Sequence, residues 1–248
     1  MLPPNRWPVS VAELPIYVVS VTTFAERHRH MNAQAEKYGL NLEYLWRFDA
    51  DALTDGDMAR VKAGALPLPS ISAVLKHLEA QVRQMASAQS VCLVLEDDAI
   101  LFDGFVEKLE RALHLAESLD PGWLIFLGGA DNRIDARFLE SNELRLIEKP
   151  ISTAEAYLLD LAGCRRRLAW LEDNLIDLPA DHLLKTIDDR LGIRHYWVSE
   201  PLATQGSITG RFRTALDSSR GKHSRVYLMM RYWYNRLRKQ IVPRIFKR

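Results

Sequence analysis

The segment SVCLVLEDDAIL, residues 90–101, joins an apolar run to three consecutive carboxylates, Glu96, Asp97 and Asp98. Residues 91–95 are apolar throughout, which is typical of a strand covered on both faces of a sheet. Three adjacent acids repel one another, and a divalent cation bound by their oxygens would remove that repulsion. Alternatively, they precede a helix expected from Asp103, whose N-terminus would stabilise each acid by about 0.3–1 kcal/mol. The residue types alone leave both explanations open.

Strands and helices are expected to alternate on both sides of this segment. Strands are expected at residues 15–20, 42–48, 91–95, 123–127, 156–159 and 194–198, with a further short one at 144–148. Helices are expected at residues 22–39, 70–88, 103–119, 161–172 and 180–191. Thr22 or Thr23 is expected to cap the first helix and Gly39 to end it. Residues 49–69 predict a loop with one helical turn, and residues 131–154 an irregular segment. The alternation predicts an α/β fold with a mostly parallel, mixed sheet flanked by helices.

The 248 residues, 48% of them hydrophobic and 26% charged, fit one soluble globular domain. We expect an N-terminal arm (1–14), a main domain (15–210) and a C-terminal extension (211–248). The two cysteines, Cys92 and Cys164, lack neighbouring metal ligands and are expected to be buried thiols in a reducing compartment. No signal peptide is evident, and no apolar run approaches the roughly 18 residues that a membrane span needs. These features predict a cytoplasmic protein.

The C-terminal extension is basic and aromatic. Ten of the 33 Lys and Arg residues, and none of the 32 Asp and Glu residues, lie between Ser218 and Arg248, so residues 1–217 carry a net charge of −9. A helix that Pro243 ends is expected here, with an apolar stripe formed by Val226, Met229, Met230, Trp233, Leu237 and Ile241. As an interfacial anchor, it would meet the inner face of the cytoplasmic membrane through Met230, Trp233, Tyr234, Arg238 and Lys239. The alternatives are docking on the acidic body of the protein and nucleic-acid binding, which no motif supports.

Several further residues are candidates for a site. Ligands of open α/β sheets bind beyond the carboxyl ends of the strands, where the three acids are expected. Gly128 and Gly129 follow another strand and either allow a ligand to approach or form a turn. His77 lies near the apolar stripe of its helix, as a satisfied core histidine would, and Asp181 is either a helix N-terminal acid or a second site acid. The chain contains no P-loop, dinucleotide-binding glycine motif, HExxH, CxxC or GxSxG.

Taken in order, the segments resemble glycosyltransferase family 25, which holds bacterial lipooligosaccharide sugar transferases and, more distantly, collagen galactosyltransferases. PIYVVSVTTFAERHRHM is similar to the family's opening strand and helix, with Arg27 and Arg29 at the basic positions. ISAVLKHLEAQVRQ resembles the signature helix and keeps His77, whereas Lys76 replaces the usual Ser. VCLVLEDDAILFDGF matches the acidic motif almost letter for letter, and AYLLDLAGCRRRL, LPADHLL and PLATQGS resemble later blocks. The resemblance covers residues 15–207.

The resemblance implies a single GT-A-like domain and an inverting transfer of a hexose, galactose or glucose, from a UDP-sugar, assisted by Mn²⁺ or Mg²⁺. The acceptor would be a saccharide of lipopolysaccharide, lipooligosaccharide or another cell-surface glycan. Asp97 and Asp98 would hold the metal and, with Glu96, the donor diphosphate. Arg27, His77, Gly128 and Gly129 would also contact the donor. One carboxylate must act as general base, and the expected order is Asp181, then Glu155, then Asp131.

Two alternatives to an enzyme stay open. The first is a non-catalytic protein that binds a nucleotide sugar. The second is a membrane-associated scaffold whose acids merely cap a helix. Donor hydrolysis in the absence of an acceptor separates the enzyme from both, because neither alternative cleaves the donor.

Overall fold

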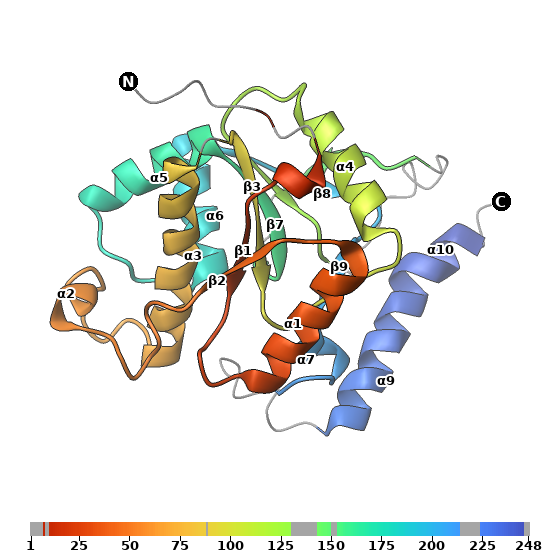
Figure 1. Cartoon of the computed structure of the whole chain (residues 1–248), viewed down its shortest axis with the longest axis horizontal. Helices are drawn as coiled ribbons and strands as arrows, with labels where there is room; N and C mark the ends of the chain where they lie inside the picture. Colours follow the sequence, from red (N-terminus) through yellow and green to blue (C-terminus); the bar gives the residue numbers. More distant parts are fainter. Residues whose placement is uncertain are drawn as a thin grey trace.

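The structure is a computed structural model, which describes Trp7 and residues 10–87, 89–129, 143–149, 153–213 and 224–245. A seven-stranded sheet in the order β2-β1-β3-β7-β5-β8-β6 forms its centre (Figure 1). The strands are β1 (Ile16–Val19), β2 (Leu42–Leu45), β3 (Val91–Glu96), β5 (Trp123–Phe126), β6 (Leu146–Glu148), β7 (Ala156–Asp160) and β8 (Arg194–Val198). The pairs β1–β2, β1–β3 and β5–β8 are parallel, whereas β7 is antiparallel to β3 and β5, and β6 is antiparallel to β8. Since β6 and β7 alone oppose the other strands of this sheet, the fold is the mixed, mostly parallel α/β domain that was expected.

Helices cover both faces of the sheet (Figure 1). They are α1 (Ala25–Tyr38) and α4 (Phe105–Ala116) on one face, and α3 (Leu68–Ala86), α5 (Leu161–Glu172) and α6 (Ala180–Leu191) on the other. Strand β3 alternates between these layers, because Leu93 and Leu95 join the core of α1 and α4 while Cys92 and Val94 join the core on the opposite face. Both cysteines are buried free thiols, as expected.

A second, two-stranded ribbon changes the interpretation of the acids. β4 (Ala99–Leu101) follows the acids directly and pairs antiparallel with β9 (Ala203–Gln205), which leads into the short helix α7 (Gly206–Thr209). Helix α4 begins only at Phe105, after Gly104 at its N-cap, and its one first-turn acid is Glu107. The helix-cap explanation for the three acids is therefore wrong, because a strand separates them from the helix.

Other boundaries differ by a few residues, for local reasons. Helix α1 starts at Ala25 with Phe24 at the N-cap and no side-chain cap, so neither Thr22 nor Thr23 caps it, whereas Gly39 ends it in the left-handed conformation as expected. Strand β2 stops at Leu45, three residues early, before a turn in which Phe48 has a φ of 70°. The predicted helical turn is α2 (Asp55–Met58).

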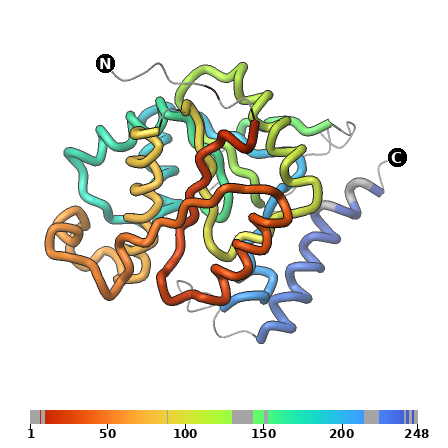
Figure 2. Tube along the Cα trace, viewed as in Figure 1, coloured from red at the N-terminus to blue at the C-terminus, as the bar shows by residue number. Residues whose placement is uncertain are grey.

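The part of the C-terminal extension that the structure describes from residue 225 onward is helical and lies at the side of the domain, away from the sheet (Figure 2). It comprises α9 (Arg225–Arg236), a π-helical turn (Leu237–Ile241) and α10 (Val242–Ile245). Pro243 lies inside α10, which continues directly from the π-helical turn, so it does not end the helix as the sequence predicted. Within the described residues, no helix is both long and apolar enough to cross a membrane.

Candidate functional site

A cavity of about 300 Å³ opens at the carboxyl ends of β1 and β3. Its walls come from the β1–α1 connection, the loop after β2, the N-terminal half of α3, the three acids and the start of α7. Val19, Phe24 and Ala73 make part of the wall apolar, and Arg27 and the acids make the rest charged. The cavity lies where open α/β sheets bind their ligands.

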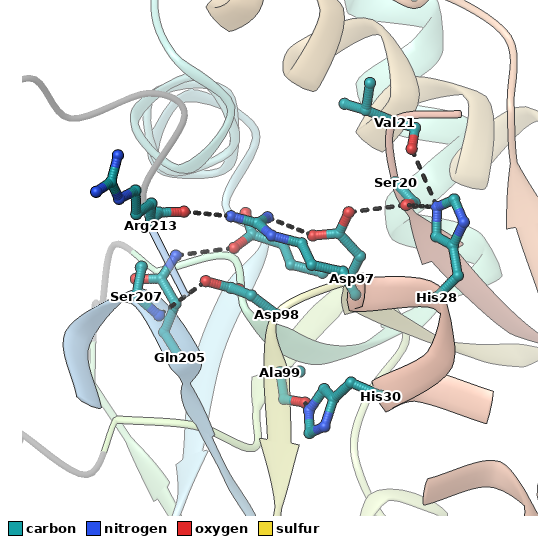
Figure 3. Close-up of polar contacts among 12 residues, drawn as sticks. Ser20, Val21, His28, His30, Asp97, Asp98, Ala99, Gln205, Ser207 and Arg213 are labelled. Atoms are coloured by element: carbon teal, nitrogen blue, oxygen red, sulfur yellow. Dashed lines mark hydrogen bonds and ion pairs between the residues drawn. The ribbon is translucent and has the colours of Figure 1, made fainter. Parts of the chain in front are cut away.

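Asp97 fixes Arg27 at this cavity. Arg27 Nη1 donates to Asp97 Oδ1 at 2.6 Å, and the Ser20 hydroxyl donates to Asp97 Oδ2 at 2.7 Å (Figure 3). Arg27 Nη2 also donates to the carbonyl oxygen of Arg213 at 2.6 Å. The sequence suggested Arg27 and Asp97 separately, and the structure brings them together. Both oxygens of Asp97 are already bonded, so Asp97 would have to exchange a partner to bind a metal.

Asp98 is buried and only half satisfied. Its Oδ2 accepts a hydrogen bond from the Ser207 N–H at 3.0 Å (Figure 3), and its carbonyl oxygen accepts one from the Gly206 N–H at 2.8 Å. Its Oδ1 is buried and has no hydrogen-bond partner in the described part of the chain. Burial, reinforced by the charge of Glu96, raises the pKa of Asp98 to about 7.

Glu96 has partners that stabilise its charge. Gln205 Nε2 donates to Glu96 Oε2 at 3.0 Å, and His77 Nε2 lies 3.5 Å from Glu96 Oε1. The other ring nitrogen of His77, Nδ1, lies 2.7 Å from the Tyr157 hydroxyl, which fixes the ring. Burial opposes ionisation, but His77 and Gln205 outweigh it and hold the pKa of Glu96 below its usual value. His77 therefore stabilises the charge of Glu96, in addition to being a buried histidine whose Nδ1 is hydrogen-bonded.

Glu155 lies against the same acids. The Glu96 N–H donates to the Glu155 carbonyl oxygen at 2.9 Å, and the Gly129 N–H donates to Glu155 Oε1 at 3.0 Å. A Cβ on Gly128 would collide with the Glu155 carboxylate, so Gly128 leaves room for this side chain. Burial, together with the charges of Glu96 and Asp98, raises the pKa of Glu155 to about 7.

The other expected bases lie elsewhere. Asp181 is in the first turn of α6, where its Oδ1 accepts a hydrogen bond from the His182 N–H at 2.9 Å. Neither Asp181 nor Glu155 lines the cavity, but Glu155 packs behind Glu96 and Asp98, which do. Asp131 lies outside the described residues. Of the two candidate bases that the structure describes, Glu155 is thus the one in electrostatic contact with Glu96 and Asp98.

Lys76 and Asp49 line the cavity although the sequence pattern did not single them out as site residues. Lys76 Nζ donates to Asp49 Oδ1 at 2.6 Å and to the carbonyl oxygens of Ser20 and Leu45 at 2.5 and 3.2 Å. These bonds fasten α3 to the ends of β1 and β2. A lysine beside the buried leucines of a signature helix was the available clue, because a buried ammonium needs a carboxylate partner.

The acids are suited to a divalent cation whose coordination shell is completed by a substrate. Among the residues that the structure describes, no group of three or more His, Cys, Asp or Glu side chains is arranged to hold a metal ion. Glu96 and Asp98 supply two neighbouring carboxylates, and Asp98 Oδ1 is a buried oxygen without a partner. Mg²⁺ in nucleotide sites typically takes one or two carboxylates and completes its shell with water and phosphate oxygens. Two carboxylates are therefore a suitable donor set for Mg²⁺ or the similarly oxygen-seeking Mn²⁺.

The C-terminal helix turns its apolar stripe outward. Met230, Trp233 and Tyr234 are 65%, 53% and 61% exposed, and Arg238 is also exposed. Leu228 and Tyr232, on another face, are buried. The helix therefore docks on the protein and still exposes most of the residues expected to meet a membrane; Lys239 is half-buried.

No protein-family model matches the chain, and no curated protein matches it.

Proposed function

We propose that the protein is an inverting glycosyltransferase that moves a hexose, galactose or glucose, from a UDP-sugar to a hydroxyl group of a saccharide acceptor. One observation carries the proposal: a cavity at the carboxyl edge of the sheet combines a fixed arginine with buried acids, one of which has an unpartnered oxygen. The resemblance of the acidic segment to glycosyltransferase family 25 supports the same conclusion.

The two parts of the cavity suit the two parts of a nucleotide sugar. The apolar wall of Val19, Phe24 and Ala73 offers a surface to a planar base. Arg27 offers a guanidinium group to the diphosphate, with the planar donors that favour phosphate oxygens. Mn²⁺ or Mg²⁺ at Glu96 and Asp98 would supply the positive charge that stabilises a departing diphosphate.

The transfer needs a base as well as a leaving group. The acceptor oxygen forms a bond to the anomeric carbon while the bond from that carbon to the diphosphate oxygen breaks, and the hydroxyl proton passes to a carboxylate. A base is most effective when its pKa lies near the working pH. Glu155, whose pKa burial raises to about 7, meets this requirement. We therefore favour Glu155 over Asp181 as the general base.

We further propose that the acceptor lies at an anionic membrane surface, as a lipid-linked glycan of the lipopolysaccharide or lipooligosaccharide type does. The exposed stripe with Met230, Trp233 and Tyr234 and the excess of basic residues in the extension support peripheral binding. Flotation with vesicles of phosphatidylglycerol and phosphatidylcholine tests this. The full chain should float and Trp233→Ser should float less; equal flotation of the two would contradict the anchor.

A donor screen tests the enzyme. The midpoint temperature of thermal unfolding should rise when UDP-galactose or UDP-glucose is added in the presence of Mn²⁺, because a ligand that binds only the folded state stabilises it. The stabilising donor should then be hydrolysed slowly without an acceptor, and Glu155→Gln should suppress that hydrolysis. A donor that binds without being cleaved, in the presence or absence of saccharides, would identify a non-catalytic nucleotide-sugar-binding protein instead.

A further inference from the structure

The segment after β9 holds two of the three acids. Gln205 bonds to Glu96, and the successive N–H groups of Gly206 and Ser207 bond to the carbonyl and the carboxylate of Asp98. Figure 3 shows Gln205 and Ser207 on the side of Asp98 that is opposite to Ser20. The position of Asp98 therefore depends on where the Gln205–Ser207 segment lies.

Helix α9 packs on the other end of that segment, at a junction that requires glycine. Gly210 ends α7 with a φ of 79°, and a Cβ there would lie 2.6 Å from the Arg225 carbonyl oxygen and 3.3 Å from Leu228 Cβ. Such a contact with backbone is closer than van der Waals packing allows. The first turn of α9 therefore packs directly against the end of α7. The contact is at Gly210, which is four residues after Gly206.

A second contact joins the end of α9 to the same ribbon. The Arg236 guanidinium lies over the Phe102 ring, 4.9 Å from its centroid. Phe102 follows β4, and its N–H donates at 2.8 Å to the carbonyl oxygen of Leu202, the residue before β9. Leu228, Tyr232 and Arg236 are four residues apart, so they form one face of the helix, here called the inner face.

We propose that the inner face of α9 positions Asp98 and Glu96 by holding the β9–α7 segment. The exposed apolar stripe of the same helix, here called the outer stripe, is then free to bind an anionic membrane surface. The two faces then have separate tasks. A change on the inner face disturbs the acid site, and a change on the outer stripe affects surface binding alone. The proposal rests on the proposed function only for what the acids bind, because the link between helix and acids is a property of the protein without ligands.

Hydrogen exchange of the full chain tests the link without any ligand. Gly210→Ala should speed exchange of the Gly206 and Ser207 amides at least tenfold, because the clash with Arg225 separates α7 from α9. Gly64→Ala is the matched control: Gly64 also has a positive φ, 73°, but nothing lies within 4 Å of the position of its Cβ. Both substitutions carry the left-handed backbone strain, and only the first touches α9. If the Gly206 and Ser207 amides exchanged at the same rates in Gly210→Ala as in Gly64→Ala, the proposal would be overturned.

Two nearby residues of the helix provide a second comparison, which also covers the case that Gly210→Ala does not fold. Tyr232→Ser changes the inner face and should speed exchange at Gly206 and Ser207, and Tyr232→Phe should restore the slow rates. Met230→Ser changes the outer stripe at a side chain that is 65% exposed, and it should leave these amides unchanged while weakening vesicle flotation. Unaltered exchange in Tyr232→Ser, or faster exchange in Met230→Ser, would contradict the separation of the two faces.

UDP binding with Mn²⁺ tests the positioning role at the acids themselves. UDP should bind less tightly to Tyr232→Ser than to the wild type, Tyr232→Phe should restore the affinity, and Met230→Ser should bind UDP as the wild type does. Wild-type affinity in Tyr232→Ser would overturn the positioning role. Absence of UDP binding in the wild type would refute the proposed function, whereas the exchange results would still decide this inference.

Discussion

Two of the buried charge clusters in the described part of the chain differ in their balance of charge. In the first, between α5, α6 and β8, Arg167 pairs with both oxygens of Asp188 at 2.6 and 2.9 Å, and His195 Nε2 lies 2.6 Å from Asp188. In the second, at the carboxyl edge of the sheet, Glu96, Asp98 and Glu155 lie together while Arg27 is taken by Asp97. The first cluster contains its own counter-charge, whereas the second has an excess of negative charge facing a cavity.

The pKa values of the buried carboxyl groups follow that difference. Burial opposes ionisation of Asp188, yet the Arg167 charge and His195 hold its pKa below the usual value. Burial raises the pKa of both Asp98 and Glu155 to about 7, because neighbouring acids reinforce the effect of burial and the Arg27 charge offsets only part of it at Asp98. We therefore expect the balanced cluster to stabilise the fold, and the unbalanced one is the place where we propose that a cation binds.

The largest effect is expected from breaking the balanced cluster. Arg167→Met leaves Asp188 buried with one partner fewer and should lower the free energy of unfolding by about 3–5 kcal/mol, as measured by urea denaturation. Lys185→Met is the control, because the pair that Lys185 forms with Asp189 is largely solvent-exposed, and such pairs contribute about 1 kcal/mol or less. Similar losses in the two variants would show that the Arg167 cluster is not a stabilising unit.

The opposite sign is expected in the unbalanced cluster. Asp98→Asn removes a carboxylate that must ionise while buried and should raise the free energy of unfolding by about 1–3 kcal/mol at pH 8, since each pKa unit corresponds to about 1.4 kcal/mol. The same urea titration measures it, with Asp103→Asn as the exposed control. Destabilisation by Asp98→Asn would mean that the acids are already neutralised within the protein.

The pH dependence sharpens the same contrast. The pKa values of Asp98 and Glu155 in the folded state are about 7, above their usual values of 3.8 and 4.5. In the pH range between the usual and the raised values, the folded state therefore binds more protons than the unfolded state. The free energy of unfolding should therefore fall as pH rises from about 4.5 to 7 and then level off. Thermal unfolding at several pH values measures this fall, and Asp98→Asn should make it shallower. A stability that rises across this window would contradict the raised pKa values.

The smallest effect is expected at the connection behind Glu96. Tyr157→Phe removes the hydroxyl bonded to His77 Nδ1 and should cost about 1 kcal/mol of unfolding free energy, measured by urea denaturation. Phe126→Leu is the control, because it removes the ring contact between Phe126 and Tyr157 and keeps the Tyr157 hydroxyl. A Tyr157→Phe variant as stable as the wild type would show that the hydroxyl does not support His77.

The central layers of the fold could be predicted from local patterns. The apolar runs at residues 91–95 and 194–198 and the helical periodicity at residues 161–172 and 180–191 give the observed elements with almost the observed limits. Strands β4 and β9 could not be predicted, because each has only three residues and its partner lies about a hundred residues away. Such strands form because the partner is present, and no periodicity marks them.

The candidate site was predictable in its residue types and not in its pairings. The sequence suggested Glu96, Asp97 and Asp98 because three acids follow a buried strand. The sequence could not show that Arg27 forms an ion pair with Asp97, since the two side chains meet only after α1 folds onto β3. It ranked Asp181 above Glu155, because the environment that raises the pKa of Glu155 is built from residues distant in the chain.

The most direct test of the central claim is calorimetric titration of UDP into the protein with and without Mn²⁺. The wild type should bind UDP at least ten times more tightly with Mn²⁺, whereas Asp98→Asn should bind it equally weakly in both conditions. Tight, metal-dependent binding that survives in Asp98→Asn, or wild-type binding that is indifferent to Mn²⁺, would contradict the assignment of the acids to a metal–diphosphate site.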